Sequence, residues 1–247
     1  MKRISLVLIS VLLISAVLLS ACSKAATGNT VKVATDATFK PFEYTDDQGN
    51  LIGIDIELME MIAEKAGFTI EWVNLPFDSA LAGISECQYD ASIAAISITD
   101  ERKQSMLFSD PYMTAGLVVV VAADNTTING MDDLVGLTVA AQLGTTGELA
   151  AQAIEGVTYK PYDSYELAFL DLANGQIDAV VADSPVAAGY VKANPESIKM
   201  VGDVFDSADY GVALCKDNTE LLEKVNAALS ELIAEGAVDE LSKKYNP

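Results

Sequence analysis

Short apolar runs alternate with amphipathic segments along most of the chain. Residues 117–122 and 177–182 are continuous apolar runs, which are typical of strands buried on both faces of a sheet. Residues 53–66 instead repeat apolar positions at helical spacing and are followed by Gly67, a common helix stop. This alternation predicts an α/β fold with parallel sheets that helices cover on both faces.

The same reading predicts elements over the whole chain beyond residue 30. Strands are expected at 31–35, 69–73, 91–98, 117–122, 137–141, 158–161, 177–182, 199–201 and 210–215, and helices at 53–66, 77–85, 147–154, 165–174, 219–234 and 238–245. The stretch from residue 31 to residue 247 is longer than a typical single α/β unit, so two lobes are expected. Short extended segments at 112–116 and 206–210 are the predicted crossings, and two crossings allow a cleft to hinge.

The segment 89–102 carries the first sign of a binding site. The apolar run 91–98 predicts a buried strand, and Ser97, Thr99 and Asp100 at its end favour a helix start just before Arg102. Ligands of open α/β sheets lie beyond the carboxyl ends of the strands. Hydroxyls, free backbone N–H groups and a guanidinium suit a carboxylate ligand. A Thr99 N-cap beside a solvated Arg102 would explain the same residues.

The first residues predict export and a lipid anchor. Lys2 and Arg3 precede an apolar stretch from residue 4 to 21, as in a secretory signal. The tetrad Leu-Ser-Ala-Cys22 resembles the bacterial lipobox, whose cysteine is acylated after cleavage. We therefore expect a signal peptide over 1–21, lipidation of Cys22 and a small polar tether to residue 30. An uncleaved membrane span is the alternative, since the apolar stretch is long enough.

Charge and composition exclude several function classes. Cleavage removes Lys2 and Arg3, which reduces the basic residues from 15 to 13 against 36 acidic ones and makes the net charge −23. Such a polyanion repels nucleic acid and anionic headgroups. The chain has no histidine, so it lacks the commonest general base and the usual zinc ligand, and no metal site is visible. Cys87 and Cys215 are either packed thiols or a disulfide, and no cofactor is expected.

Several motifs occur in an order that is familiar. Residues 34–44 (Ala-Thr-Asp-Ala-Thr-Phe-Lys-Pro-Phe-Glu-Tyr), 53–57, 94–102, 108–112, 144–147, 177–183 and 210–213 together resemble the polar amino-acid-binding branch of bacterial ABC-transporter solute-binding proteins. The resemblance covers residues 31–247. It implies a two-lobed periplasmic-binding-protein-like fold of type II. Residues 31–111 and 211–247 would form lobe 1 and residues 117–205 lobe 2.

The resemblance also assigns roles around the ligand's α-carbon. Arg102 and Ser97 would hold the α-carboxylate, together with the N–H and hydroxyl of Thr146 from the other lobe. Asp183 would hold the α-ammonium, because a buried ammonium needs a charged partner. A capping box of Thr145 with Glu148 and an N-cap role for Asp183 are the structural alternatives.

Specificity would come from the ligand's side-chain pocket. Phe39 and Phe77 match positions that sandwich the ligand, and Asp36 matches the acid that meets its polar end. Asp36 opposes an acidic ligand and suits an amide or a cation, so glutamine, arginine and lysine lead.

Departures from the relatives leave that choice open. Ala94 and Ala95 stand where some binders of basic amino acids carry serines, and Gln142 stands where a glutamine binder has lysine. The aromatic and Asp36 positions have an alternative reading as core and turn residues.

The expected function is therefore a lipid-anchored binding protein, monomeric, that brings a polar L-amino acid to the permease and ATPase subunits of an ABC importer. We expect no enzymatic activity. The alternatives are a dehydratase-type enzyme on the same scaffold, with Asp36 or Glu43 as the acid, and an ectodomain that senses its ligand.

Overall fold

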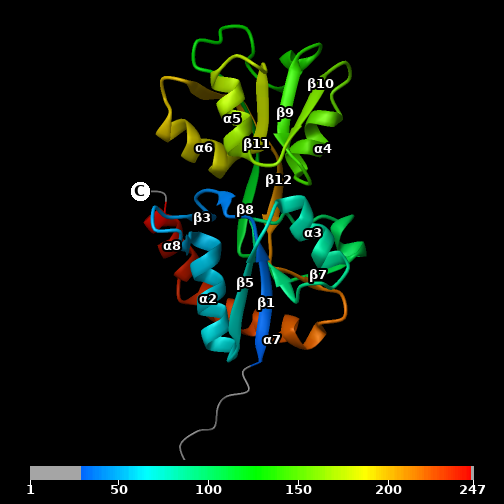
Figure 1. Ribbon diagram of the computed structural model, residues 1–247, viewed down its shortest axis with the longest axis vertical. Helices are drawn as coiled ribbons and strands as arrows, with labels where there is room; N and C mark the ends of the chain where they lie inside the picture. Colours follow the sequence, from blue (N-terminus) through cyan, green and yellow to red (C-terminus); the bar gives the residue numbers. More distant parts are fainter. Residues whose placement is uncertain (1–28, 246–247) are drawn as a thin grey trace, which may run out of the picture.

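The computed structural model describes residues 29–245. The predicted signal peptide and Cys22 therefore lie outside the described residues. Within them, the chain has no helix with the length and apolar character that a membrane crossing requires. The molecule is elongated and consists of two α/β lobes, one above the other in Figure 1.

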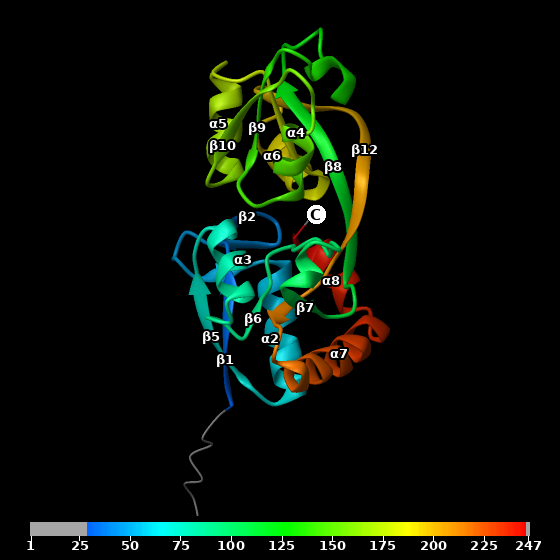
Figure 2. The ribbon, with the colours of Figure 1, turned by 90° about the vertical axis from the view of Figure 1, so that its right-hand side faces the viewer.

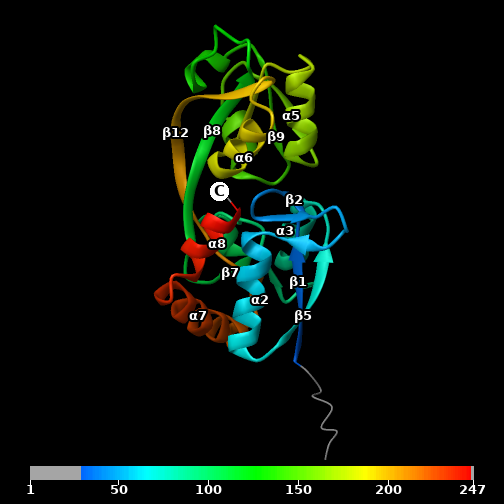
Figure 3. The ribbon, with the colours of Figure 1, turned by 90° about the vertical axis from the view of Figure 1, so that its left-hand side faces the viewer.

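Lobe 1 is built on a five-stranded sheet with the order β5-β1-β6-β13-β7. Its strands are β1 (Thr30–Thr35), β5 (Thr69–Asn74), β6 (Ala91–Ser92), β7 (Met106–Phe108) and β13 (Ala213–Cys215). β1 pairs in parallel with β5 and β6, whereas β13 is antiparallel to β6 and β7. Helices α2 (Ile54–Ala66), α7 (Thr219–Ala234) and α8 (Ala237–Tyr245) pack together on one face, as Figure 3 shows. Helix α3 (Phe77–Ser85) packs on the other face, against Ala94, Ile96 and Ala213.

Lobe 2 repeats this plan with the strand order β10-β9-β11-β8-β12. Its strands are β8 (Met113–Ala122), β9 (Thr138–Gln142), β10 (Thr158–Tyr162), β11 (Ala179–Asp183) and β12 (Ile198–Tyr210). Helices α5 (Tyr165–Ala173) and α6 (Ser184–Ala193) lie on one face. Helix α4 (Thr146–Gln152) and the short 3₁₀ helix η3 (Met131–Leu134) lie on the other.

Two long strands connect the lobes. β8 and β12 run antiparallel between them and pair Thr114 with Asp209 and Met113 with Tyr210 at the lobe 1 end. Figure 2 shows this ribbon along one side of the molecule. Its register shifts on either side of Phe205, which breaks the ladder of an otherwise continuous pair. Residues 113–116 of the first predicted crossing lie in β8, directly after Tyr112, and the second predicted crossing, 206–210, lies in β12.

Three sequence predictions need correction. The sheets are mixed, because β13 in lobe 1 and β8 in lobe 2 pair antiparallel with their neighbours. The buried strand predicted over 91–98 is only the two residues of β6, and the helix start predicted before Arg102 is a 3₁₀ turn, η2 (Arg102–Gln104). Thr99 still acts as a cap, since its hydroxyl accepts the Arg102 N–H at 3.2 Å.

A small antiparallel sheet was not predicted. β2 (Thr38–Phe39), β3 (Glu43–Thr45) and β4 (Leu51–Ile52) form it at the top of lobe 1, facing lobe 2. Strands of two or three residues carry no readable periodicity. This sheet places Phe39 and Glu43 under the other lobe.

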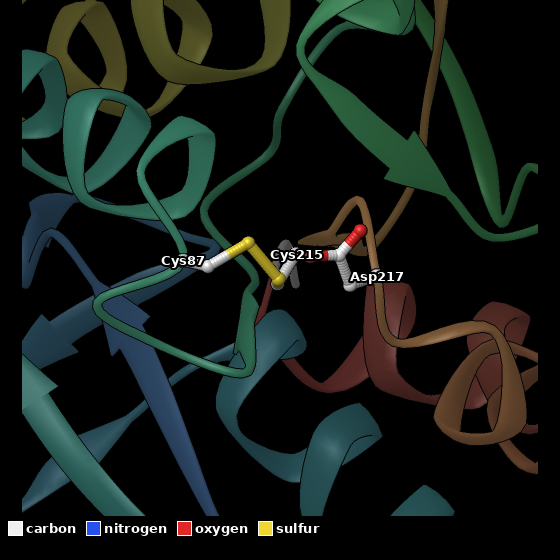
Figure 4. A group of neighbouring side chains, drawn as sticks. All are labelled: Cys87, Cys215 and Asp217. Carbon is white, nitrogen blue, oxygen red and sulfur yellow. A yellow bond between two sulfur atoms is a disulfide. The ribbon is translucent and has the colours of Figure 1, made fainter.

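The two described cysteines form a disulfide. Cys87, after α3, is bonded to Cys215 at the end of β13, with their Cα atoms 4.9 Å apart. Figure 4 shows the bond beside Asp217. The three residues also form the one group of potential metal ligands found in the described part of the chain. Because both sulfurs are in the disulfide, this group lacks thiolate ligands.

Candidate functional site

Arg102 reaches across from lobe 1 to lobe 2. Its NH1 donates to the Ser97 carbonyl at 2.7 Å, and its NH2 donates to the Gly144 carbonyl at 2.8 Å. The guanidinium carbon lies 5.6 Å from the centre of the Phe77 ring, within the range of a cation–π contact. Burial lowers the pKa of Arg102, and the nearby Asp183 opposes that shift. The guanidinium is thus held at the junction of the lobes and is not a solvated side chain.

Asp183 ends β11 in lobe 2 and is buried. It occupies the N-cap position of α6, but its side chain makes no capping hydrogen bond. Instead its Oδ1 accepts a hydrogen bond from the Tyr210 hydroxyl at 2.5 Å. Burial raises the pKa of Asp183 to about 6, while Tyr210 and Arg102 act in the opposite direction. The carboxylate therefore faces Arg102 and the ribbon between the lobes.

Asp36 and Gln142 meet across the two lobes. The Gln142 amide donates through Nε2 to Oδ2 of Asp36 at 2.6 Å and to the Asp163 carbonyl at 3.1 Å. The Thr38 hydroxyl donates to Oδ1 of Asp36 at 2.8 Å. Burial raises the pKa of Asp36, and these hydrogen bonds lower it. Because both acceptors fix the amide nitrogen, the buried Oε1 of Gln142 points elsewhere, and among the described residues it has no donor.

Aromatic rings surround this contact. The Phe39 ring of lobe 1 lies 5.6 Å from the Tyr165 ring of lobe 2, which stacks on Phe169 at 5.8 Å. Phe39 and Phe77 are both buried but belong to different clusters. Phe77 lies under Arg102, and Phe39 lies against Tyr165. The hydrophobic core is therefore continuous from one lobe to the other at Phe39.

The start of α4 supplies the lobe 2 side of the Arg102 contact. The expected cap is present: the Thr145 hydroxyl accepts the Glu148 N–H at 3.2 Å, and Glu148 accepts the Gly144 N–H at 2.6 Å. This arrangement leaves the next residue, Thr146, half-buried at the first position of the helix. The cap accounts for Thr145 and Glu148, and Thr146 is not part of it.

The loop before Arg102 has an unusual backbone. Ala95 has φ of 46°, in the left-handed region that residues with a side chain disfavour. Its N–H donates to the buried Oδ2 of Asp55 at 2.7 Å, and the Tyr112 hydroxyl donates to the same oxygen at 2.8 Å. Ser97 then pairs with Tyr210 of β12 in an isolated bridge. Asp55 thus holds the loop and the start of the ribbon together.

Of the predicted site residues, Asp36, Phe39, Arg102 and Gln142 make contacts between the lobes, Ser97 and Phe77 contact Arg102, and Asp183 contacts Tyr210. Ala95 instead contacts Asp55 within lobe 1, and Thr146 follows the Gly144–Thr145 turn at the start of α4. Contacts across the junction of the lobes join Arg102 with Gly144, Asp36 with Gln142, and Phe39 with Tyr165. Sequence reasoning missed the roles of Asp55, Tyr112, Tyr165 and Tyr210 around this junction. Asp55 reads as an ordinary acid in the first turn of α2, and the tyrosines read as core, so the sequence contained no signal that would have singled them out.

The family model for bacterial extracellular solute-binding proteins, family 3, matches residues 31–247. The chain belongs to this family. The L-cystine-binding protein TcyJ of Escherichia coli (strain K12) is 33% identical over 225 residues, which cover 90% of this chain and 85% of that protein. The family membership makes the chain an extracellular solute-binding protein.

Solved structures of the family agree with the two-lobed fold. An ancestral arginine-binding protein bound to arginine has a TM-score of 0.84 and 41% identity, over 87% of this chain and 97% of that one. An ancestral arginine-binding protein bound to glutamine has a TM-score of 0.83 and 42% identity over the same shares. The type II binding-protein fold predicted from the sequence is thereby confirmed.

Proposed function

We propose that the protein binds an L-amino acid between its two lobes and delivers it to an ABC importer. Arginine is the ligand that we expect to bind most tightly. The observation that carries this proposal is the contact of Asp36 with Gln142. It brings together a buried carboxylate and an amide oxygen that has no donor among the described residues. Both are acceptors, and a guanidinium offers five N–H donors in a planar fork. The solved relative bound to arginine supports the same choice.

The α-carbon end of the ligand is proposed to lie at the other half of the junction. Arg102 has further N–H donors beyond those used by Ser97 and Gly144, and a carboxylate accepts such donors bidentately. The half-buried Thr146 hydroxyl and N–H and the Ser97 hydroxyl are the lobe 2 and lobe 1 donors beside it. Asp183, which no capping bond occupies, is the partner of the ammonium.

Glutamine is the second candidate ligand. Its amide could donate to Asp36 and accept from Gln142 Nε2, and a solved relative is bound to glutamine. Arginine is favoured because Asp36 is buried and its side-chain partners among the described residues, Thr38 and Gln142, are uncharged. A cationic ligand would offset the cost of burying an ionised carboxylate there. A glutamate ligand would place a second carboxylate beside Asp36.

Closure of the lobes is the proposed mechanism. Residues 31–111 and 211–247 form one moving body and residues 117–205 the other, with the β8–β12 ribbon as the hinge around 112–116 and 206–210. The ligand contacts both bodies, so it stabilises the closed arrangement by its differential contacts. The permease would then recognise the closed form. A 33% identical relative from Escherichia coli (strain K12), named a putative ABC transporter arginine-binding protein, supports that partner.

Cys22 is proposed to carry the lipid anchor. The lipobox-like sequence before it supports this, and a chain of this charge needs an anchor other than electrostatic attraction to anionic lipid. Expression in a bacterial host tests it: the wild type should appear in the membrane fraction, whereas Cys22→Ser should not carry lipid. Equal lipid labelling of both proteins would contradict the anchor. Gel filtration with and without ligand tests the proposed monomer.

Titration calorimetry on residues 23–247 tests the ligand. The panel is arginine, lysine, ornithine, glutamine, histidine and cystine, with glutamate as the control for charge. Arginine should bind most tightly, and glutamate should not bind. Tighter binding of glutamine than of arginine would overturn the assignment to a cationic ligand. Absence of binding by any amino acid at millimolar concentration would reject the proposed function.

A further inference from the structure

Two carboxyl groups meet in the core beneath the candidate site. Glu43 of β3 and Asp55 of α2 both have 0% exposure. The Asp55 N–H donates to the Phe42 carbonyl at 2.9 Å, so the start of α2 rests on the residue before Glu43. Gly53 permits this approach, since a Cβ there would lie 2.0 Å from the Phe42 oxygen. Glu43, the next residue after Phe42, therefore lies beside the first turn of α2, which contains Asp55.

Their oxygens are satisfied unequally. Asp55 Oδ2 accepts two donors, the Ala95 N–H at 2.7 Å and the Tyr112 hydroxyl at 2.8 Å. Asp55 Oδ1 and both Glu43 oxygens find no separate donor group among the described residues. Two ionised carboxylates cannot share such a position cheaply, whereas one proton between them turns repulsion into a hydrogen bond. Because two donors already stabilise ionised Asp55, the proton belongs on Glu43.

The electrostatic surroundings point the same way. Burial raises the pKa of Glu43 well above its ordinary value of 4.5, and the charges of Asp55, Asp36 and Asp183 raise it further. Burial raises the pKa of Asp55 to about 6, while Ala95 and Tyr112 act against that rise. The titratable groups that face Glu43 thus come from α2, the end of β1, β11 and, through Tyr112, the ribbon.

We propose that Glu43 is a positioning residue of the binding site that acts through Asp55. As a neutral acid it donates to Oδ1 of Asp55 and keeps Oδ2 directed at Ala95 and Tyr112. Ala95 is thereby held in its left-handed conformation at the start of the loop that leads to Ser97 and Arg102. Tyr112 is held directly before β8, one of the two strands that join the lobes. One buried proton therefore supports both the site loop and the crossing.

The binding part of this inference rests on the proposed function, but the protonation of Glu43 does not. Infrared difference spectra of the ligand-free protein test the protonation directly. At about pH 7, well above the ordinary glutamate pKa, the wild type minus Glu43→Gln spectrum should contain the C=O band of a protonated carboxylic acid. Glu64→Gln, an exposed residue of the same α2, is the matched control and should give no such band. A wild-type spectrum without the Glu43 band would overturn the proposal.

Unfolding measurements give a second readout that needs no ligand. A carboxyl whose folded pKa is raised holds its proton in the folded state over a pH range in which the unfolded chain has lost it. Ionisable Glu43 therefore makes the wild type less stable as pH rises above 4.5, and Glu43→Gln lacks this loss. Asp36, Asp55, Asp183 and Tyr112 are present in both proteins. The stability of Glu43→Gln relative to wild type should therefore rise as the pH increases above 4.5, and parallel curves would contradict the proposal.

Ligand binding separates positioning from simple packing. Glu43→Gln retains a donor for Asp55 and should bind arginine within about threefold of the wild type. Glu43→Ala lacks the donor, leaves Asp55 Oδ1 unsatisfied, and should bind about 5- to 150-fold more weakly. Equal losses in both variants would reject the role of the donor. If the wild type binds no amino acid, the proposed function fails, while the infrared and unfolding results still decide the state of Glu43.

Discussion

The Gln142 amide nitrogen lies 2.6 Å from the Asp36 carboxylate, although the residues are 106 positions apart and come from different lobes. The contact defines what this end of the site offers to a ligand. Asp36 accepts and carries charge, and Gln142 contributes an oxygen that is buried without a donor among the described residues. Groups of this kind select a ligand end rich in N–H donors.

Replacing Asp36 should therefore change which ligand is bound. Asp36→Asn removes the charge but keeps the size, so arginine should lose about 2–5 kcal/mol of binding free energy. Glutamine should lose less, because it needs only a hydrogen-bond acceptor there. Calorimetry with both ligands measures the difference. Asp163→Asn is the control, because it removes the charge of an exposed residue and keeps the backbone carbonyl that contacts Gln142. Equal losses for the two ligands would contradict a charge contact at Asp36.

Replacing Arg102 should weaken the binding of every amino acid, since all amino acids share the α-carboxylate. Arg102→Ala should cost about 2–5 kcal/mol of binding free energy. Arg102→Lys should recover only part of it, because an ammonium cannot span Ser97, Gly144 and a carboxylate in one plane. Lys103→Ala, an exposed neighbour, is the matched control for charge. Wild-type affinity in Arg102→Ala would mean that the carboxylate lies elsewhere.

Binding should also depend on pH through Asp183. Its pKa is raised to about 6 by burial, so below that pH the ligand's ammonium loses its anionic partner. Arginine affinity should fall as pH decreases from about 7 to about 5, and it should level off above about 7. Asp183→Asn should bind weakly at every pH and show a flatter profile.

Asp183 should make the stability of the ligand-free protein fall as the pH rises, which is opposite to its effect on ligand affinity. Because the folded pKa of Asp183 lies above its ordinary value of 3.8, the folded state retains the proton longer than the unfolded chain. This residue therefore lowers the free energy of unfolding as pH rises from 3.8 to about 6. Comparing wild type with Asp183→Asn by urea denaturation over that range measures the effect. A stability difference that does not change with pH would contradict the raised pKa.

Helix positions were predictable where local signals agreed. Helices α3 and α7 begin and end at the predicted residues, because their apolar periodicity is bounded by Pro76 in one case and by turn residues in the other. The run 91–98 misled because its residues are buried, as in a strand, while its backbone turns at Ala95. The Asp55 side chain holds that turn from 40 positions away, which no local pattern reports.

In the candidate site, the positions of single charged residues were predictable, but their partners were not. Arg102, Asp183 and Asp36 each follow a predicted strand end, where sheet topology places ligand-facing groups. Their partners could not be predicted, because Tyr210 reaches Asp183 and Gln142 reaches Asp36 only through the docking of two lobes. In the sequence, Tyr210 has the pattern of a core tyrosine, and Gln142 that of a residue at a strand end. The pairing of these polar groups therefore depends on tertiary structure, whereas the position of each acid or base at a strand end can be predicted from the local sequence.

The Cys87–Cys215 disulfide should stabilise the folded protein. Cys87 and Cys215 are 128 positions apart, and the loop they close contains the whole of lobe 2. Closing a loop of that length reduces the entropy of the unfolded chain, so reduction should lower the free energy of unfolding by about 3–5 kcal/mol. Denaturation with and without reductant measures this, and Cys87→Ala with Cys215→Ala should match the reduced protein. The backbone N–H groups of Cys87 and Cys215 donate to Ile84 and Asp90 and not to a proposed ligand contact, so affinity below the unfolding transition should stay within about threefold. An unchanged denaturation midpoint on reduction would contradict this role of the disulfide.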